Sequence, residues 1–184
     1  MSASIATRTG DDGTTGMLFG QRVAKDHPQI EAVGAFDELN AALGFAKAFC
    51  SDSTRRHELE SIQSDLINLM GELACAQSDT ERFMSSKFAK LMETDLARLD
   101  AMLVVLESRN LSTEGWATPG STLPAAALDL ARTAARRAER RLVTVGATGR
   151  IVRPVVGHYI NRLSDLLWLM ARDASRPVAA QQKH

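Results

Sequence analysis

Apolar residues recur at spacings of three and four along most of the chain after residue 27, and no other feature constrains the fold as strongly. Such spacing gathers apolar side chains on one face of an α-helix. Prolines at positions 28, 124 and 154 suit the first turn of a helix, where the backbone N–H that proline lacks has no partner within the helix. Glycines at positions 146 and 149 suit a helix end. The pattern therefore predicts five helices separated by short connections.

The predicted helices follow one another with little sequence between them. Their apolar seams cover residues 28–49, 59–73, about 85–109, 124–145 and 154–174. In the third helix, Phe88 and Leu91 are expected to face inward. Long helices joined by short links typically pack as an antiparallel bundle. We therefore expect an all-α protein, with a five-helix antiparallel bundle over residues 28–175 and an ordered glycine-rich loop before it.

Composition limits the classes of protein to which the chain could belong. A length of 184 residues suits one domain, with residues 1–27 as the loop and residues 176–184 as a flexible tail. The chain has 22 basic and 22 acidic residues, so we expect no general attraction to nucleic acid or to acidic membranes. No apolar run approaches the ~20 residues of a membrane span. Without the apolar core of a signal peptide, a cytoplasmic location is expected.

The first 26 residues are rich in glycine and threonine, and their basic residues include Arg8 and Lys25. Glycine permits close approach of the backbone, so N–H and hydroxyl groups in such a segment can wrap a polyphosphate. Lysine can add a point charge for phosphate. The chain has no GxxxxGK[ST] sequence, so the segment is not a Walker A loop. A flexible N-terminal arm remains the alternative.

A second candidate feature is the run RTAARRAERR at residues 132–141 of the fourth predicted helix. Four of its charged residues fall near one helix face because they lie three or four positions apart. They are Arg132, Arg136, Glu139 and Arg140. An acidic pair, Asp37 and Glu38, lies on the first predicted helix and could neutralise part of this charge. A solvated face with surface salt bridges is the alternative interpretation.

The last predicted helix carries Asn161 and Asp165, four residues apart on one face, and Asn161 could contact a sugar or a base edge. A polar stripe on an amphipathic helix is the alternative. The four histidines, at positions 27, 57, 158 and 184, have no glutamate three residues before them. Di-iron bundle proteins require that motif on two helices, so di-iron chemistry is excluded.

Taken together, these stretches resemble the PduO-type ATP:cob(I)alamin adenosyltransferases, also called corrinoid adenosyltransferases. The resemblance rests on residues 7–26, 32–44, 62–74, 132–141 and 159–172, which follow the order and spacing of that family. It implies a five-helix bundle that forms a homotrimer. It also implies that ATP lies at each subunit interface, between the N-terminal loop of one chain and the arginine-rich helix of its neighbour.

The resemblance further assigns roles to individual residues. It implies that the triphosphate is held by Thr7, Arg8, Thr9, Gly10, Thr15, Gly16 and Lys25. The ATP site would be completed by Arg136, Arg137, Glu139, Arg140 and Asn161. Asp37 would pair with Arg132 across the interface, and the catalytic set would be Arg136, Lys25, Asp37 and Arg132.

The implied reaction transfers the 5′-deoxyadenosyl group of ATP to cob(I)alamin, giving adenosylcobalamin and triphosphate. Cobalt would attack ribose C5′ in line, with Mg²⁺ carried by the ATP phosphates rather than by protein ligands. Trp116 stands where the family more often has phenylalanine, so we expect it to cap the lower face of the corrin. A reductase and an adenosylcobalamin-dependent client enzyme are implied as further partners. A non-catalytic carrier or sensor of ATP and cobalamin, and a purely structural bundle, remain alternatives.

Overall fold

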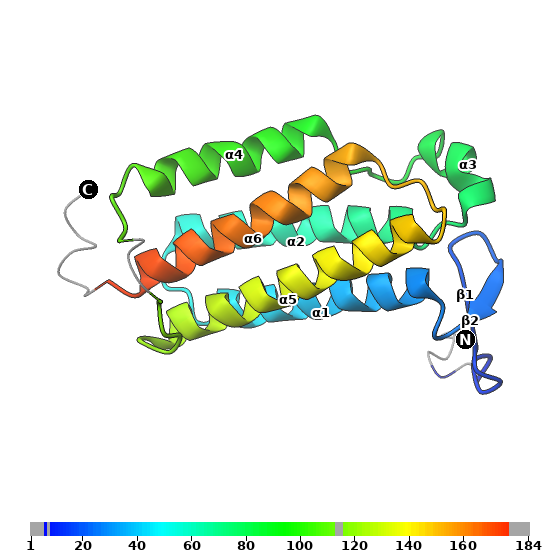
Figure 1. The fold of residues 1–184 in the computed structure, drawn as a ribbon, viewed down its shortest axis with the longest axis horizontal. Helices are drawn as coiled ribbons and strands as arrows, with labels where there is room; N and C mark the ends of the chain where they lie inside the picture. The colour runs from blue at the N-terminus through cyan, green and yellow to red at the C-terminus, as the bar shows by residue number, and fades with distance from the viewer. Residues whose placement is uncertain (1–5, 7, 113–115, 177–184) are drawn as a thin grey trace, which may run out of the picture.

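A computed structural model describes residues 6, 8–112 and 116–176 of the chain. Its long helices are α1 (Pro28–Ala48), α2 (Ser53–Leu73), α4 (Glu93–Glu107), α5 (Leu123–Ala147) and α6 (Pro154–Ala174). Its short elements are the strands β1 (Thr14–Gly16) and β2 (Arg22–Ala24), the 3₁₀ turn η1 (Gln77–Asp79) and the helix α3 (Thr80–Met84). The long helices run side by side (Figure 1), with α5 packed between α1 and α6. The predicted all-α bundle is confirmed.

Helix boundaries follow the local signals of the sequence. Each proline at the start of α1, α5 and α6 occupies a first helical turn, as predicted. The side chain of Asp52 caps α2 by accepting from the backbone N–H of Thr54 at 2.8 Å. Thr122 caps α5 by accepting from the N–H of Ala125 at 3.2 Å. Such caps satisfy N–H groups that a helix start leaves unpaired.

The third predicted helix is wrong at its beginning. The helix α4 starts only at Glu93, and residues 85–92 form an irregular segment after the short helix α3. The carboxylate of Asp95 accepts from the N–H of Met92 at 2.9 Å, which fixes the start of α4 there. Leu91 is buried as predicted, but Phe88 is 48% exposed and stacks on Phe83 at 6.2 Å instead of facing inward.

The core is formed by apolar seams that meet along the bundle axis. Phe36, Leu39 and Leu43 of α1 are fully buried in this core. On α5, the buried residues facing the core are largely alanines, which allow neighbouring helix backbones to approach closely. Full burial of one large apolar side chain contributes about 1.5–3 kcal/mol. The buried apolar faces predicted from spacing therefore fix how the helices pack, and with it the position of the charged residues on α5.

A buried polar network joins three of these helices. Asp65 of α2 accepts a hydrogen bond of 2.6 Å from the hydroxyl of Tyr159 in α6, and it forms an ion pair with Arg98 of α4. Arg98 also pairs with Asp95 at 3.1 Å. Burial raises the pKa of the Asp65 carboxyl, and burial raises the pKa of Tyr159 well above its usual range. The hydroxyl of Tyr159 therefore acts as a donor, and the network fixes α4 against the bundle.

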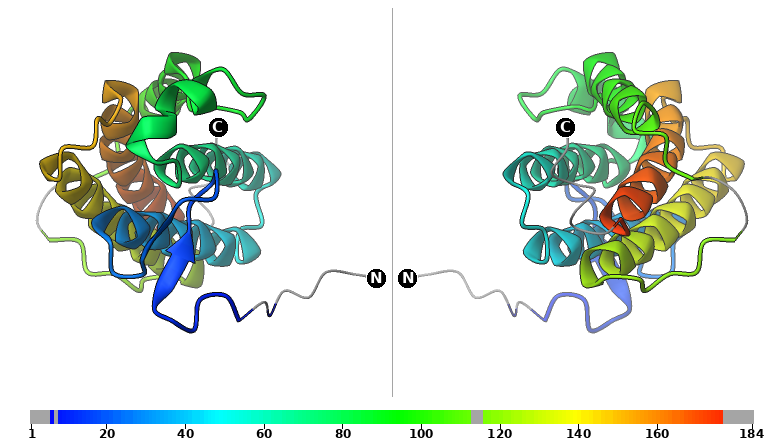
Figure 2. Two further views of the ribbon diagram at one scale, coloured as in Figure 1. Left: turned by 90° about the vertical axis from the view of Figure 1, so that its right-hand side faces the viewer. Right: turned by 90° about the vertical axis from the view of Figure 1, so that its left-hand side faces the viewer.

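The first part of the chain forms a small antiparallel hairpin of β1 and β2, in which Thr15 is opposite Val23. Gly13 and Gly20 adopt positive φ values of 80° and 94°, which place tight turns at the base and at the tip. The hairpin lies at the end of the bundle where α1 begins and α5 ends (Figures 1 and 2). Residues 177–184, most of the predicted tail, lie outside the described residues.

Within the described ranges, no helix combines the length and the hydropathy that crossing a membrane requires.

Candidate functional site

From residue 8 to the start of α1, the glycine-rich loop forms turns and a short hairpin. Lys25 donates its backbone N–H to the carbonyl of Gly13 at 2.9 Å. Its side chain lies against Gly10, where an added Cβ would come within 3.1 Å of both Cε and Nζ. Glycine at position 10 therefore brings the lysine ammonium next to backbone. Thr7, also predicted for this site, lies outside the described residues.

A set of contacts that we did not anticipate holds this loop in shape. Asp12 accepts from the backbone N–H of Thr14 at 2.9 Å and from its hydroxyl at 2.7 Å. These hydrogen bonds lower the pKa of the Asp12 carboxyl. Arg22 donates to the Thr14 hydroxyl at 3.0 Å and to the carbonyl of Thr9 at 2.5 Å. The Asp-x-Thr spacing is a local turn signal that could have identified part of this arrangement.

Thr15 lies within β1, and Gly16 ends it. Arg8 adopts a positive φ of 58° at the start of the described loop, a conformation uncommon outside glycine. Arg8, Thr9, Gly16 and Lys25 are exposed, while Gly10 and Thr15 are half-buried. The loop thus presents uncharged donors and the cations Arg8, Arg22 and Lys25 at one end of the bundle.

The arginine-rich face of α5 is divided between paired and unpaired residues. Arg137 forms an ion pair with Glu38 of α1, and Arg141 pairs with Glu31 at 3.3 Å. These two ion pairs agree with the alternative interpretation of the arginine run, a solvated helix face with surface salt bridges. By contrast, the exposed guanidinium of Arg136 has no hydrogen-bond or ion-pair partner in the described part of the chain. Its position leaves it available to an anion from outside the protomer.

Two further predicted residues connect α5 to α6. Glu139 accepts from the side-chain amide of Asn161 at 3.2 Å. Arg140 donates to the carbonyl of Arg136 at 3.0 Å, so its guanidinium lies along the same helix surface. The structure therefore places Arg136, Glu139 and Arg140 on one face of α5, as their spacing predicted, with Asn161 of α6 beside Glu139.

Arg132 lies nearer the start of α5, beside a hollow of ≈ 480 Å³. It donates to Asp129 at 3.0 Å, and the buried Asp129 also pairs with Arg172 of α6. Trp116 and Trp168 line the same hollow. Trp116 is 98% exposed. The structure thus groups Arg132 with two tryptophans, of which sequence reasoning singled out only Trp116.

The glycine-rich loop and the arginine face occupy different parts of one protomer. The loop lies at the end of the bundle where α1 begins (Figure 1), whereas the arginines belong to the second half of α5, where Arg137 and Arg141 pair with α1. Asp37, on the exposed side of α1, has no hydrogen-bond or ion-pair partner among the described residues. One chain therefore presents two incomplete sets of charged groups rather than a closed site.

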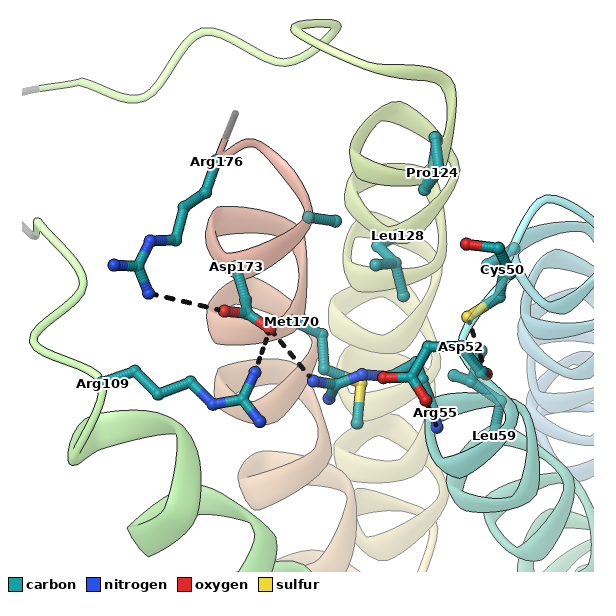
Figure 3. Close-up of a pocket in the computed structure, with 13 residues that line it drawn as sticks. Cys50, Asp52, Arg55, Leu59, Arg109, Pro124, Leu128, Met170, Asp173 and Arg176 are labelled. Atoms are coloured by element: carbon teal, nitrogen blue, oxygen red, sulfur yellow. Dashed lines mark hydrogen bonds and ion pairs between the residues drawn. The ribbon is translucent and has the colours of Figure 1, made fainter. Parts of the chain in front are cut away.

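A separate cavity of ≈ 290 Å³ lies at the opposite end of the bundle (Figure 3). Asp173 of α6 accepts there from Arg55 at 3.3 Å and from Arg109 at 2.5 Å, and Arg176 lies 4.0 Å away. Glu58 pairs with Arg55 at 3.1 Å. Since each of these carboxylates is paired with arginine, we interpret the cluster as a tie between the ends of α2, α4 and α6. The sequence pattern did not indicate it.

In the ranges that the structure covers, no group of three or more histidine, cysteine, aspartate or glutamate residues is placed to hold a metal ion. Cys50 and Cys75 are free, and burial raises the pKa of both thiols.

Comparison with known proteins places this geometry in context. The sequence model of a family described as cobalamin adenosyltransferase matches residues 5–174. The corrinoid adenosyltransferase PduO of Salmonella typhimurium is 45% identical over 172 residues, covering 92% of this chain and 49% of that protein. A corrinoid adenosyltransferase of Citrobacter freundii is 38% identical over 172 residues, covering 91% of this chain and 93% of that protein. The chain thus spans about half the length of the PduO relatives but nearly all of the shorter one.

Solved structures are similar over the whole bundle. One is a variant of the PduO-type ATP:corrinoid adenosyltransferase from Lactobacillus reuteri, complexed with cobalamin and ATP. It has a TM-score of 0.85 at 31% identity, with 97% of this chain and 96% of that chain covered. A second variant, complexed with ATP, has a TM-score of 0.82 at 31% identity.

Proposed function

Since the chain belongs to the cobalamin adenosyltransferase family, we propose that it transfers the 5′-deoxyadenosyl group of ATP to cob(I)alamin, giving adenosylcobalamin and triphosphate. The observation that carries this proposal is the separation of two complementary half-sites. An ordered donor-rich loop lies at one end of the bundle, and an arginine face with an unpaired Arg136 lies along α5. Neither half is a complete nucleotide site, so a neighbouring subunit would supply the other.

We propose that the loop holds the triphosphate. Lys25, brought against Gly10, would supply a point charge, and Thr9 and Thr15 would supply hydroxyl groups beside it. Thr7, Arg8 and Gly16 complete this proposed set. The hydrogen bonds of Arg22 to Thr14 and Thr9 fix the shape of the loop and support the assignment, because preorganised donors need not be rearranged during the reaction.

The other half-site would come from α5 and α6 of a second subunit in a homotrimer. Arg136, Arg137 and Arg140 would neutralise the triphosphate, while Glu139 and Asn161 would contact the nucleoside. Their shared face and the hydrogen bond between Glu139 and Asn161 support this grouping. Arg137 would exchange or share its pairing with Glu38 when ATP binds.

The reacting cobalt of cob(I)alamin is itself the nucleophile, so the protein would contribute orientation and charge rather than a general base. Holding ribose C5′ in line with the cobalt can lower the activation free energy by about 7–11 kcal/mol. Lys25 and the arginines would stabilise charge on the departing triphosphate. Magnesium ions, carried by the ATP phosphates, would supply further neutralisation of phosphate charge.

The hollow beside Arg132 is the proposed place for the corrin. Trp116, which is almost fully exposed, and Trp168 of α6 both line it. A flat apolar ring over the lower face would exclude a lower axial ligand from cobalt and ease its reduction. The contact between the Arg172 guanidinium and the Trp168 ring, at 5.7 Å, keeps the second tryptophan in place.

Replacing this ring tests the assignment. The Trp116→Ala variant should bind ATP as the wild type does, yet lose about tenfold or more in activity when the reductant is weak, because cobalt would retain its lower ligand. Activity with a strong reductant should be much closer to wild type. Parallel assays with the two reductants measure the difference. Equal activities of variant and wild type under both conditions would remove Trp116 from the corrin site.

The proposed subunit contact between Asp37 and Arg132 makes a separate prediction. The trimer of the Asp37→Asn variant should already dissociate at protein concentrations at which the wild type stays assembled, and activity should fall in parallel. The reason is that Arg132 would face an uncharged side chain at a partly buried interface. Arg132 would still keep its pairing with Asp129 within the chain, so each protomer should remain folded. Sedimentation across a concentration series measures assembly. A trimer as stable and as active as wild type would contradict the pairing.

An anaerobic assay tests the function itself. Purified protein is mixed with chemically reduced cobalamin and Mg·ATP, and the absorption spectrum is followed. Light-sensitive adenosylcobalamin and released triphosphate are expected. ATP binding without either product would overturn the transferase proposal and leave the alternative of a non-catalytic carrier or sensor of ATP and cobalamin.

The proposal also includes a single domain over residues 1–184, a cytoplasmic location, a reductase that supplies cob(I)alamin and an enzyme that consumes adenosylcobalamin.

A further inference from the structure

We infer that Arg150, in the turn between α5 and α6, is a positioning residue for the nucleotide-binding hairpin. It would touch neither ATP nor cobalamin and would act through the segment at residues 74–79, on which the hairpin rests. The inference rests on the proposed function, because it assumes that the hairpin binds ATP.

The guanidinium of Arg150 is held by the connection between α2 and α4. The residue is 9% exposed. Its Nη1 donates to the side-chain carbonyl of Gln77 at 2.9 Å and to the Thr80 hydroxyl at 3.0 Å, while Nη2 donates to the carbonyl of Glu72 at 3.1 Å. The same oxygen of Gln77 accepts from the N–H of Ile151 at 3.0 Å. One side chain thus spans the whole η1 turn.

The preceding residue explains why Arg150 points into this turn. Gly149 adopts a φ of +88°, a conformation that L side chains rarely adopt. This glycine ends α5 and reverses the chain. A buried guanidinium is costly unless its N–H groups are paired, and two of its nitrogens find three oxygens here. The turn at Gly149 therefore directs the Arg150 side chain, and the hydrogen bonds of Arg150 in return hold this turn in place.

The segment that Arg150 holds is also the support of the hairpin. The backbone N–H of Leu18 donates to the carbonyl of Ala74 at 2.9 Å. The amide of Gln21 donates to the Ser78 hydroxyl at 2.9 Å and to Asp79 at 3.0 Å. These three contacts lie at the tip of the hairpin, between β1 and β2, and they join it to residues 74–79.

The hairpin depends on this support because it is too small to be stable alone. Each strand has three residues, and a two-stranded hairpin is at best marginally stable in water. At its tip Met17 is buried, and Phe19 contacts the Arg82 guanidinium at 4.2 Å and Phe88 at 6.4 Å. A shift of residues 74–79 would therefore move Thr15 and Lys25 relative to the bundle, and ATP affinity would fall.

Two variants and a matched control test the inference. Arg150→Gln removes the guanidinium, and Gln77→Ala removes the oxygen shared by Arg150 and Ile151 from an exposed position where the fold should tolerate the change. The control is Arg153→Gln. Arg153 also pairs with Glu72, but it holds the carbonyl of Leu91 instead of the η1 turn.

Hydrogen exchange at the hairpin amides and calorimetric ATP affinity are the two measurements. We expect both test variants to exchange the Leu18 amide about tenfold or more faster and to raise the Kd for ATP about tenfold, the equivalent of one hydrogen bond to a charged group. The KM for ATP should rise with it, while kcat at saturating ATP stays within about threefold of wild type. Arg153→Gln should leave the Leu18 amide and the ATP affinity unchanged.

The inference would be overturned if a folded Gln77→Ala or Arg150→Gln variant exchanged the Leu18 amide at the wild-type rate and bound ATP with the wild-type Kd. Equal effects in Arg153→Gln would do the same, since they would indicate general destabilisation. A wild-type protein that binds ATP but forms no adenosylcobalamin would refute the transferase function alone. Exchange and affinity would then still decide the role of Arg150.

Discussion

The Arg136→Ala variant is expected to lose about a hundredfold to a thousandfold in kcat, the range observed when one preorganised donor to a developing negative charge is removed. The guanidinium is exposed on α5 and, in the part of the chain that the structure describes, has no intramolecular partner. Truncation therefore breaks no ion pair of the fold. Stability and assembly should be unchanged, so the loss would report on catalysis alone.

The matched control is Arg141→Ala on the same helix. Arg141 pairs with Glu31 at 3.3 Å, and both side chains are about half exposed. Such a surface pair contributes about 0–1 kcal/mol, so the variant should keep wild-type activity. Steady-state kinetics with chemically reduced cobalamin and size-exclusion chromatography make the comparison. Monomeric Arg136→Ala protein, or equal losses in the two variants, would contradict the assignment of Arg136 to the triphosphate.

The largest expected effect on stability comes from Asp65→Ala, at about 3 kcal/mol of unfolding free energy. Asp65 accepts from Tyr159 at 2.6 Å and pairs with Arg98. Because burial raises the pKa of this carboxyl, the intact ion pair adds little net stability. Its removal is costly for another reason, since it leaves the buried hydroxyl of Tyr159 and part of Arg98 without an acceptor.

Urea unfolding measures this difference, with Asp100→Ala as the control. Asp100 pairs with Arg162 at 3.2 Å on the surface, where both side chains are about half exposed, and its removal should cost less than about 1 kcal/mol. Two variants with equal midpoints would show that the buried network does not hold α4 in place.

Much of the fold was predictable because its signals are local. Apolar spacing and the prolines at 28, 124 and 154 correctly placed α1, α5 and α6, and the resemblance to corrinoid adenosyltransferases is confirmed by the match over residues 5–174. The error at residues 85–92 has a physical cause. Apolar residues there follow a helical spacing, but Phe88 packs on the aromatic ring of Phe83 outside any helix.

The candidate site was predictable only in part. Helical spacing was sufficient to place Arg136, Glu139 and Arg140 on one face, and the roles given to them remain predictions. Spacing could not tell that Arg137 is paired with Glu38 while Arg136 is not. It also gave no sign of Arg150, whose partner Gln77 lies 73 residues away.

The sequence by itself therefore determined most of the helices, the apolar seams and the family, because each depends on residues close together along the chain. The tertiary structure alone decided which charges are neutralised, where the hairpin rests and which polar groups are buried. Asp65 and Tyr159 are 94 residues apart, and their hydrogen bond exists only because two apolar seams bring α2 and α6 together. Periodicity fixes which face of a helix is buried, whereas the partner of a polar group depends on which faces meet.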